Sequence, residues 1–186
     1  MVSVHIGPGD ASFVTVPTPD GPFVIIANDD AVLASGWTDD VNELAELIHD
    51  TLKPNQLDEL ASDEATADAA TPAAGILRDA AQAVSKYYAG DFQAPAEVPV
   101  TQHSGPFRMQ AWDTLRTVPA GTTWTYTEFA LNAGRPAAVR AAAAACSSNA
   151  AALFVPCHRI VKSDGSHGGF RYGLGLKESL LGREAA

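Results

Sequence analysis

The sequence predicts an α/β protein in two parts: a small β-sheet with helices over residues 1–100 and a mainly helical domain over residues 101–186. Short apolar runs separated by turn residues fill the start of the chain, a pattern that favours β-hairpins. Further along, apolar side chains recur at helical spacing. The charge of the chain also changes sign close to the boundary between these two parts. Residues 1–104 carry three basic and 17 acidic side chains, a balance of −14, and the remainder carries nine basic and five acidic, a balance of +4.

The first domain is expected to begin with a meander of hairpins, because its apolar runs are short and are separated by segments rich in Pro, Asp, Asn and Gly. Apolar spacing then predicts two helices. An acidic, alanine-rich segment interrupted by prolines predicts a loose connection between them, and a later proline-punctuated segment predicts an extended linker. The expected strands cover residues 11–16, 23–27 and 31–34, the helices 41–52 and 76–88, the connection 53–74 and the linker 93–106.

The second domain is expected to contain a helix-turn-helix over about residues 125–147. A helix over residues 107–119 precedes it. Thr125 followed by Glu128 has the spacing of a capping box, which starts a helix at that point. This helix ends near Gly134, and Pro136 is expected in the first turn of the next helix, where its missing N–H costs nothing. On this pattern alone, an ordinary corner between two helices is an alternative to a DNA-binding motif.

The second helix of this pair has an unusual composition. Residues 137–146 are alanines except for Val139, Arg140 and Cys146. Such short side chains cannot reach base edges in the major groove. They do allow the helix backbone to lie close to a surface while Arg140 projects from it. A tightly packed buried helix is the alternative, and both descriptions can hold on opposite faces.

Composition excludes several classes of protein. No apolar run approaches the ~20 residues that a transmembrane helix needs, and two cysteines are too few for a disulfide scaffold. No signal peptide is apparent at the start, so a cytoplasmic location is expected. The net charge of −10 argues against a nucleic-acid partner when it is averaged over the chain. The excess of basic residues in the second half removes that objection for the second domain.

The strongest candidate for chemistry is the sequence Pro156-Cys157-His158-Arg159. The apolar residues 150–155 predict a buried strand, and Pro156 ends its ladder pairing. Cys157 is then presented at a rigid strand end as a candidate nucleophile. A thiol is mostly protonated at neutral pH, so it needs a base, and His158 is the nearest one. A hydrolase, a redox protein that uses Cys146 as partner, and a buried cysteine beside an incidental histidine are the alternatives.

The motif Pro156-Cys157-His158-Arg159-Ile160-Val161 resembles the active-site motif of the O6-alkylguanine-DNA alkyltransferases, also called methylated-DNA–protein-cysteine methyltransferases. The resemblance extends at fixed spacing over about residues 74–184. It includes the aromatic helix from Phe107 to Pro119, Gly168-Gly169-Phe170-Arg171-Tyr172-Gly173, and Lys177-Glu178-Ser179-Leu180-Leu181 with Glu184. In the first 70 residues only the hairpin Thr18-Pro19-Asp20-Gly21-Pro22-Phe23 is similar. The resemblance implies a ribonuclease-H-like first domain.

The resemblance also implies roles for matching residues. Cys157 accepts the alkyl group from O6 of guanine, His158 acts as base through a water molecule, and Glu184 orients His158. Asn149 is the hinge between the helix-turn-helix and the nucleophile. The target nucleotide leaves the duplex, with Arg140 filling the vacated stack and Tyr126 pressing on the 3′ phosphate. The pocket walls are expected to include Cys146, Ile160, Phe170 and the backbone of Arg171.

The resulting hypothesis is direct-reversal DNA repair in which each molecule acts once, because nothing nearby could hydrolyse the thioether. The implied partner is double-stranded DNA containing O6-alkylguanine, with O4-alkylthymine as a second candidate lesion, and a monomer is expected. No cofactor and no metal are expected, and no membrane partner. Ala150, Phe170 and Thr125 depart from common family residues. A lesion-binding relative without alkyl transfer is an alternative that the presence of Cys157 disfavours.

Overall fold

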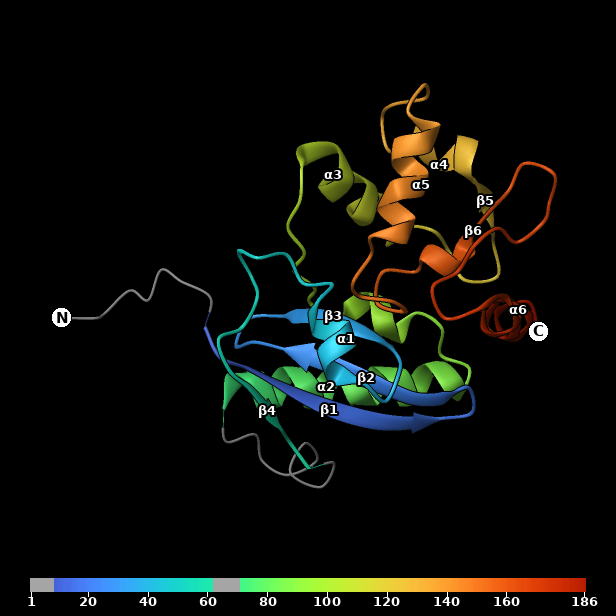
Figure 1. The fold of residues 1–186 in the computed structure, drawn as a ribbon. Helices are drawn as coiled ribbons and strands as arrows, with labels where there is room; N and C mark the ends of the chain where they lie inside the picture. Colours follow the sequence, from blue (N-terminus) through green and yellow to red (C-terminus); the bar gives the residue numbers. More distant parts are fainter. Residues whose placement is uncertain (1–8, 62–70) are drawn as a thin grey trace.

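A computed structural model describes residues 9–61 and 71–186 and has two lobes (Figure 1). The first contains a four-stranded sheet in the order β3-β2-β1-β4. Strands β1 (Ala11–Thr18), β2 (Gly21–Ala27) and β3 (Val32–Trp37) form an antiparallel meander, as predicted. The short strand β4 (Leu57–Glu59) pairs parallel to β1. The expected α/β fold class is therefore confirmed.

Strand β2 is buried on both faces, which explains its continuous apolar run. Phe23 and Ile25 pack against helix α2 (Pro72–Tyr88), whose buried side includes Leu77 and Val84. The alternate β2 residues Val24 and Ile26 pack with residues of helix α1 (Val41–Ala45) on the opposite face. The first lobe therefore has a core on each side of one sheet.

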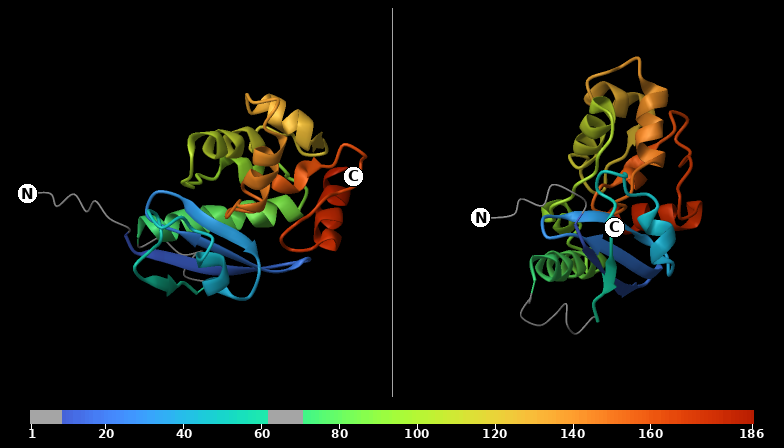
Figure 2. Two further views of the ribbon diagram at one scale, coloured as in Figure 1. Left: turned by 45° about the horizontal axis from the view of Figure 1, so that its top comes forward. Right: turned by 60° about the vertical axis from the view of Figure 1, so that its left-hand side comes forward.

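The second lobe consists mainly of helices. Helices α3 (Pro106–Leu115), α4 (Tyr126–Asn132) and α5 (Val139–Ser147) enclose a core around Trp112 and Phe129. Both views of Figure 2 place these helices on one side of the molecule and the sheet on the other. A short parallel pair, β5 (Trp124–Thr125) and β6 (Ile160–Val161), precedes the closing helix α6 (Leu174–Glu184). Within the described residues, no helix is long and apolar enough to cross a membrane.

Local signals explain where the helix-turn-helix begins and turns. The Thr125 side chain accepts from the Glu128 N–H at 3.1 Å, and the Glu128 carboxylate accepts from the Thr125 N–H at 2.7 Å, which confirms the capping box. Gly134 has φ +87°, which suits glycine at the end of a helix. Pro136 lies in a turn before α5 rather than in its first turn, because α5 begins only at Val139.

The prediction of a buried strand over residues 150–155 is wrong. The segment is buried, but only Ala151 forms a bridge, to Ser35 of β3. The Val155 N–H bonds the Ala151 carbonyl at 2.9 Å, and Leu153 adopts a positive φ of 73°, so the chain turns. A short apolar run indicates burial and does not distinguish a strand from a buried turn.

Other element boundaries also differ from expectation. Helix α2 begins at Pro72, because Thr71 caps it through a bond from the Ala74 N–H at 3.2 Å and proline is favoured in a first turn. Strand β4 lies inside the segment predicted as a loose connection, of which residues 62–70 lie outside the described residues. Helix α1 is shorter than predicted, and the expected linker contains a 3₁₀ helix, η1 (Ala94–Glu97).

Candidate active site

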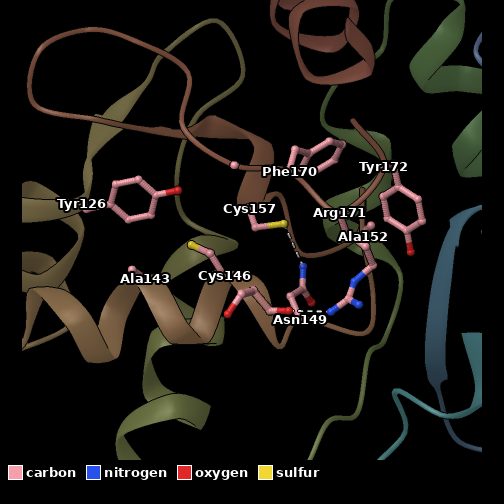
Figure 3. A pocket seen from close by; sticks show the side chains of 11 residues that line it. Tyr126, Ala143, Cys146, Asn149, Ala152, Cys157, Phe170, Arg171 and Tyr172 are labelled. Atoms are coloured by element: carbon pink, nitrogen blue, oxygen red, sulfur yellow. Dashed lines mark hydrogen bonds between the residues drawn. The ribbon is translucent and has the colours of Figure 1, made fainter. Parts of the chain in front are cut away.

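Cys157 lies at a cavity of about 350 Å³ between helix α5 and the loop that precedes α6. It begins a 3₁₀ turn, η2 (Cys157–Arg159), and not a strand end as predicted. Figure 3 shows its sulfur directed into the cavity, with Tyr126 on one side and Phe170 on the other. The cavity is lined by Tyr126, Ala143, Cys146, Ser147, Asn149, Ala152, Cys157, Gly169, Phe170, Arg171 and Tyr172.

Asn149 connects the end of α5 to the nucleophile. Its Nδ2 group donates to the Val155 carbonyl at 2.8 Å and to the Cys157 sulfur at 3.3 Å. Its Oδ1 atom accepts from the Ala151 N–H at 3.1 Å and from Gln102 Nε2 at 2.9 Å. The side chain therefore holds the 150–155 turn closed and supplies a donor to the sulfur.

His158 and Glu184 form a buried pair next to the cysteine. The distance from His158 Nε2 to Glu184 Oε1 is 2.7 Å, and both side chains are 1% exposed. A carboxylate only accepts hydrogen bonds, so Nε2 carries the proton and Nδ1 is left as the basic atom. No hydrogen bond joins the imidazole to the sulfur in the described part of the chain. A proton moving from Cys157 to His158 therefore needs an intervening group.

The protonation states follow from burial and neighbouring charges. Burial lowers the pKa of His158, although Glu184 opposes this, so the imidazole is held neutral and free to accept a proton. Burial raises the pKa of Cys157, and the Asn149 hydrogen bond and the charges of Lys177 and Arg171 act against it. The resting thiol is therefore protonated, and its activation requires a base.

Two charged residues that are not among the predicted site residues complete the site. Arg159 donates to both oxygens of Glu184 at 3.0 Å, and to the Val118 carbonyl at 2.8 Å. Burial alone would raise the pKa of Glu184, but His158 and Arg159 outweigh it and hold the value at about 2. Lys177 is completely buried and donates to the carbonyls of Ile160 and His167. Both residues lie inside motifs already quoted for the family, which was the available signal.

The cavity brings together three of the four residues that were expected in its walls. Cys146, Phe170 and Arg171 line the cavity, and the Arg171 guanidinium donates to the Ser147 carbonyl across its rim. Ile160 does not line it, because this residue is completely buried in the core formed with helices α3, α4 and α5. Ala143, Ala152 and Tyr172 also line the cavity and were not predicted.

The first lobe supports the pocket wall from behind. The Trp37 ring lies 6.2 Å from the Phe170 ring and 5.5 Å from the Tyr172 ring, centroid to centroid. Tyr172 packs directly onto the backbone of Gly36, where an added Cβ would lie 1.8 Å from the tyrosine hydroxyl oxygen. The loop that carries Phe170 is thus seated on strand β3.

The helix-turn-helix presents different residues to the cavity and to solvent. Tyr126, the first residue of α4, is half-buried and lines the cavity, with its hydroxyl directed inward (Figure 3). Arg140 is exposed in the first turn of α5, outside the lining of the cavity. On the other side of α5, Ala142 and Ala145 are completely buried. Alanines of this helix therefore lie both in the core and at the exposed surface.

These features define an α/β protein with a sheet lobe and a helical lobe, in which a helix-turn-helix adjoins a site formed by Cys157, His158 and Glu184. A family model described as "6-O-methylguanine DNA methyltransferase, DNA binding domain" matches residues 106–186. The chain is 36% identical over 111 residues to the methylated-DNA–protein-cysteine methyltransferase of Methanosarcina acetivorans, covering 60% of this chain and 70% of that one. The chain belongs to the methylated-DNA–protein-cysteine methyltransferase family.

Two further comparisons place the chain among related proteins. It is 44% identical over 91 residues, 49% of its length, to the Escherichia coli bifunctional transcriptional activator/DNA repair enzyme Ada. It spans only 26% of the length of that relative. The crystal structure of Mycobacterium tuberculosis OGT in complex with DNA has the same fold, with a TM-score of 0.74 at 23% identity over 94% of this chain and 92% of that one.

Proposed function

We propose that this protein repairs DNA by transferring an alkyl group from O6 of guanine to the sulfur of Cys157. The observation that carries the proposal is the cavity where Cys157 lies, which α5 of the helix-turn-helix bounds on one side, together with the buried hydrogen bond of the next residue, His158, to Glu184. The name of the M. acetivorans relative describes the same acceptor chemistry for that protein.

The proposed reaction is a direct displacement. His158 Nδ1 takes the thiol proton through a water molecule, while Glu184 stabilises the imidazolium that forms. The sulfur attacks the alkyl carbon, a C–S bond forms and the C–O6 bond breaks. The departing guanine oxygen carries the electron pair. The guanine then takes up the proton that the thiol gave to His158, which leaves ordinary guanine and a neutral imidazole. The product is a thioether, so each protein molecule acts once.

The substrate base must leave the duplex to reach the cavity. A volume of about 350 Å³ is within the usual range for small-molecule sites. Arg140, exposed on α5, is proposed to fill the vacated stack, and Tyr126 at the cavity edge to contact the backbone of the flipped nucleotide. Because α5 offers only short side chains beside Arg140, it suits close approach to a minor groove with little sequence readout.

The proposal needs one chain and double-stranded DNA containing O6-alkylguanine. The nucleophile, the base, the carboxylate and the helix-turn-helix all belong to a single chain, so a monomer is sufficient. Displacement by a thiol involves no redox step and no Lewis acid, so no cofactor or metal is required.

Mass spectrometry after incubation with an O6-methylguanine duplex tests this function. We expect one methyl group per protein molecule, located on Cys157 by peptide analysis, and no modification in Cys157→Ser. Repair of the duplex with Cys157 unmodified, or no repair by the wild-type protein, would contradict the proposal. Oxidation of Cys157 with Cys146 to a disulfide in place of methylation would favour the redox alternative.

A further inference from the structure

Tyr87 joins the first lobe to the carboxylate of the active site. It lies near the end of α2, the helix that covers the sheet, and it is completely buried. Its hydroxyl group donates to Glu184 Oε1 at 2.7 Å, although the two residues are separated by 97 positions in the sequence. In the sequence it is one of several apolar-face residues of a helix, and nothing there indicates this contact.

The oxygen that Tyr87 contacts is the one that orients His158. Glu184 Oε1 accepts from His158 Nε2 at 2.7 Å and from the Arg159 guanidinium at 3.0 Å as well as from Tyr87. Burial raises the pKa of Tyr87, and Glu184 raises it further, so the phenol stays protonated and acts as the donor. A neutral donor therefore stabilises the negative charge of Glu184 at the atom that binds the histidine.

We propose that Tyr87 is a positioning residue for alkyl transfer, acting through Glu184 on the basicity of His158. The inference rests on the function proposed above. By donating to Oε1, Tyr87 fixes the carboxylate rotamer and withdraws part of the charge that would otherwise stabilise an imidazolium. His158 then remains neutral, and able to accept the thiol proton, at a lower pH than it would beside a carboxylate without this donor.

Other groups that set this balance come from three elements. The titratable and charged groups around the His158–Glu184 pair are Arg159 and the adjacent Cys157 from η2, Lys177 from α6, and Tyr87 from α2. Arg159 and Lys177 both oppose an added positive charge on His158. Removing the Tyr87 hydroxyl leaves these groups in place, so the change isolates one donor to Glu184.

Tyr88 provides a matched control on the same helix. Its hydroxyl donates to Asp20 Oδ2 at 2.8 Å and accepts from Trp37 Nε1 at 3.0 Å, so it bonds a different carboxylate at nearly the same distance. Tyr88→Phe removes a partly buried phenol hydroxyl from the next position, without touching Glu184.

The experiment compares Tyr87→Phe, Tyr88→Phe and the wild-type protein in single-turnover methyl transfer as a function of pH. We expect Tyr87→Phe to react roughly tenfold more slowly at neutral pH, as befits the loss of a hydrogen bond to a charged group. In the pH–rate profile of Tyr87→Phe, the limb where the rate rises with pH should move to higher pH by about half a unit to one unit. The reason is that His158 becomes more basic and Glu184 easier to protonate. The acid limb of the pH–rate profile of Tyr88→Phe should coincide with that of the wild type.

A second readout does not depend on transfer. The His158 ring is titrated by NMR, with His158→Gln used to assign its signals, and Tyr87→Phe should raise its pKa. Site-specific 3-fluorotyrosine at position 87 keeps the hydroxyl and makes it a stronger donor. Both the acid limb of the pH–rate profile and the pKa of the His158 ring should therefore move down. This variant also serves if Tyr87→Phe does not fold.

The outcomes separate the two proposals. Suppose that the wild type transfers methyl and that Tyr87→Phe and Tyr88→Phe both have the pH–rate profile and the His158 pKa of the wild type. The inference on Tyr87 is then overturned. If the wild type transfers no methyl, the proposed function fails. In that case a shifted His158 titration still supports the coupling through Glu184, and an unshifted one overturns it.

Discussion

The two lobes of the molecule differ in charge, architecture and distance from the reacting sulfur. The sheet lobe holds most of the acidic residues, whereas the helical lobe has an excess of basic ones and carries Cys157, His158 and Glu184. Yet the sheet lobe provides Tyr87 to the carboxylate and Trp37 to the loop behind the pocket. Under the proposed function, the helical lobe carries the reacting groups and the surface that meets DNA, while the sheet lobe fixes the positions of those groups.

Removing the carboxylate in the helical lobe should produce the largest effect. Glu184→Gln leaves His158 without an orienting charge and Arg159 buried without its counter-charge. We expect methyl transfer to slow by about a hundredfold or more and the free energy of unfolding to fall by about 3 to 5 kcal/mol. Single-turnover kinetics and urea unfolding check both values. Glu178→Gln, an exposed position on the same helix, is the control and should change neither.

The same variant tests the acid stability of the site. The pKa of Glu184 is about 2, below its ordinary value of 4.5, so the stability it contributes is fully present above about pH 4.5 and is lost as pH falls through 2. The shift corresponds to about 3 kcal/mol. Glu184→Gln should therefore lose less stability than the wild type between those pH values. An identical pH dependence in the two proteins would show that the carboxylate is not held in this way.

Gly36→Ala should show a smaller effect that begins in the sheet lobe. The new Cβ would lie 1.8 Å from the Tyr172 hydroxyl oxygen, so the Tyr172 side chain, which lines the cavity and packs against Phe170, must move. We expect a loss of about 1 to 3 kcal/mol in stability and a roughly tenfold slower transfer, because a displaced wall misaligns the substrate. Gly9→Ala, whose Cβ would meet no heavy atom within 4 Å, is the control. Equal transfer rates in the two variants would mean that the pocket does not depend on β3.

Patterns in the sequence predicted those features of the structure that depend on residues close together in the chain. The hairpins and the capping box at Thr125 follow from residues within a few positions of one another, and the structure confirms them. The turn over residues 150–155 was missed because its conformation depends on bonds to Asn149 and Ser35, not on its own apolar side chains. Tyr87 was missed for a related reason: a tyrosine on an apolar helix face looks the same whether or not its hydroxyl meets a carboxylate.

The charge contrast between the lobes leads to the smallest expected effect, on the salt dependence of DNA binding. If only the helical lobe meets phosphates, and α5 offers Arg140 among alanines, few counterions are released on binding. We expect the logarithm of the affinity of Cys157→Ser for duplex DNA to fall with the logarithm of salt concentration with a slope of about −3, which corresponds to three or four phosphate contacts. Fluorescence anisotropy over about 50 to 200 mM salt measures this slope.

Two variants that each remove one positive charge assign the contacts to a lobe. Arg140→Ala should make the slope shallower by about one. Arg78→Ala should leave the slope unchanged. Arg78 lies on α2 of the sheet lobe, outside the helix-turn-helix, and is ion-paired with the neighbouring Asp79. A slope steeper than about −6 for Cys157→Ser without either change would require more phosphate contacts than are expected of this surface. An effect of Arg78 equal to that of Arg140 would place DNA against the acidic lobe and overturn the division of roles between the two.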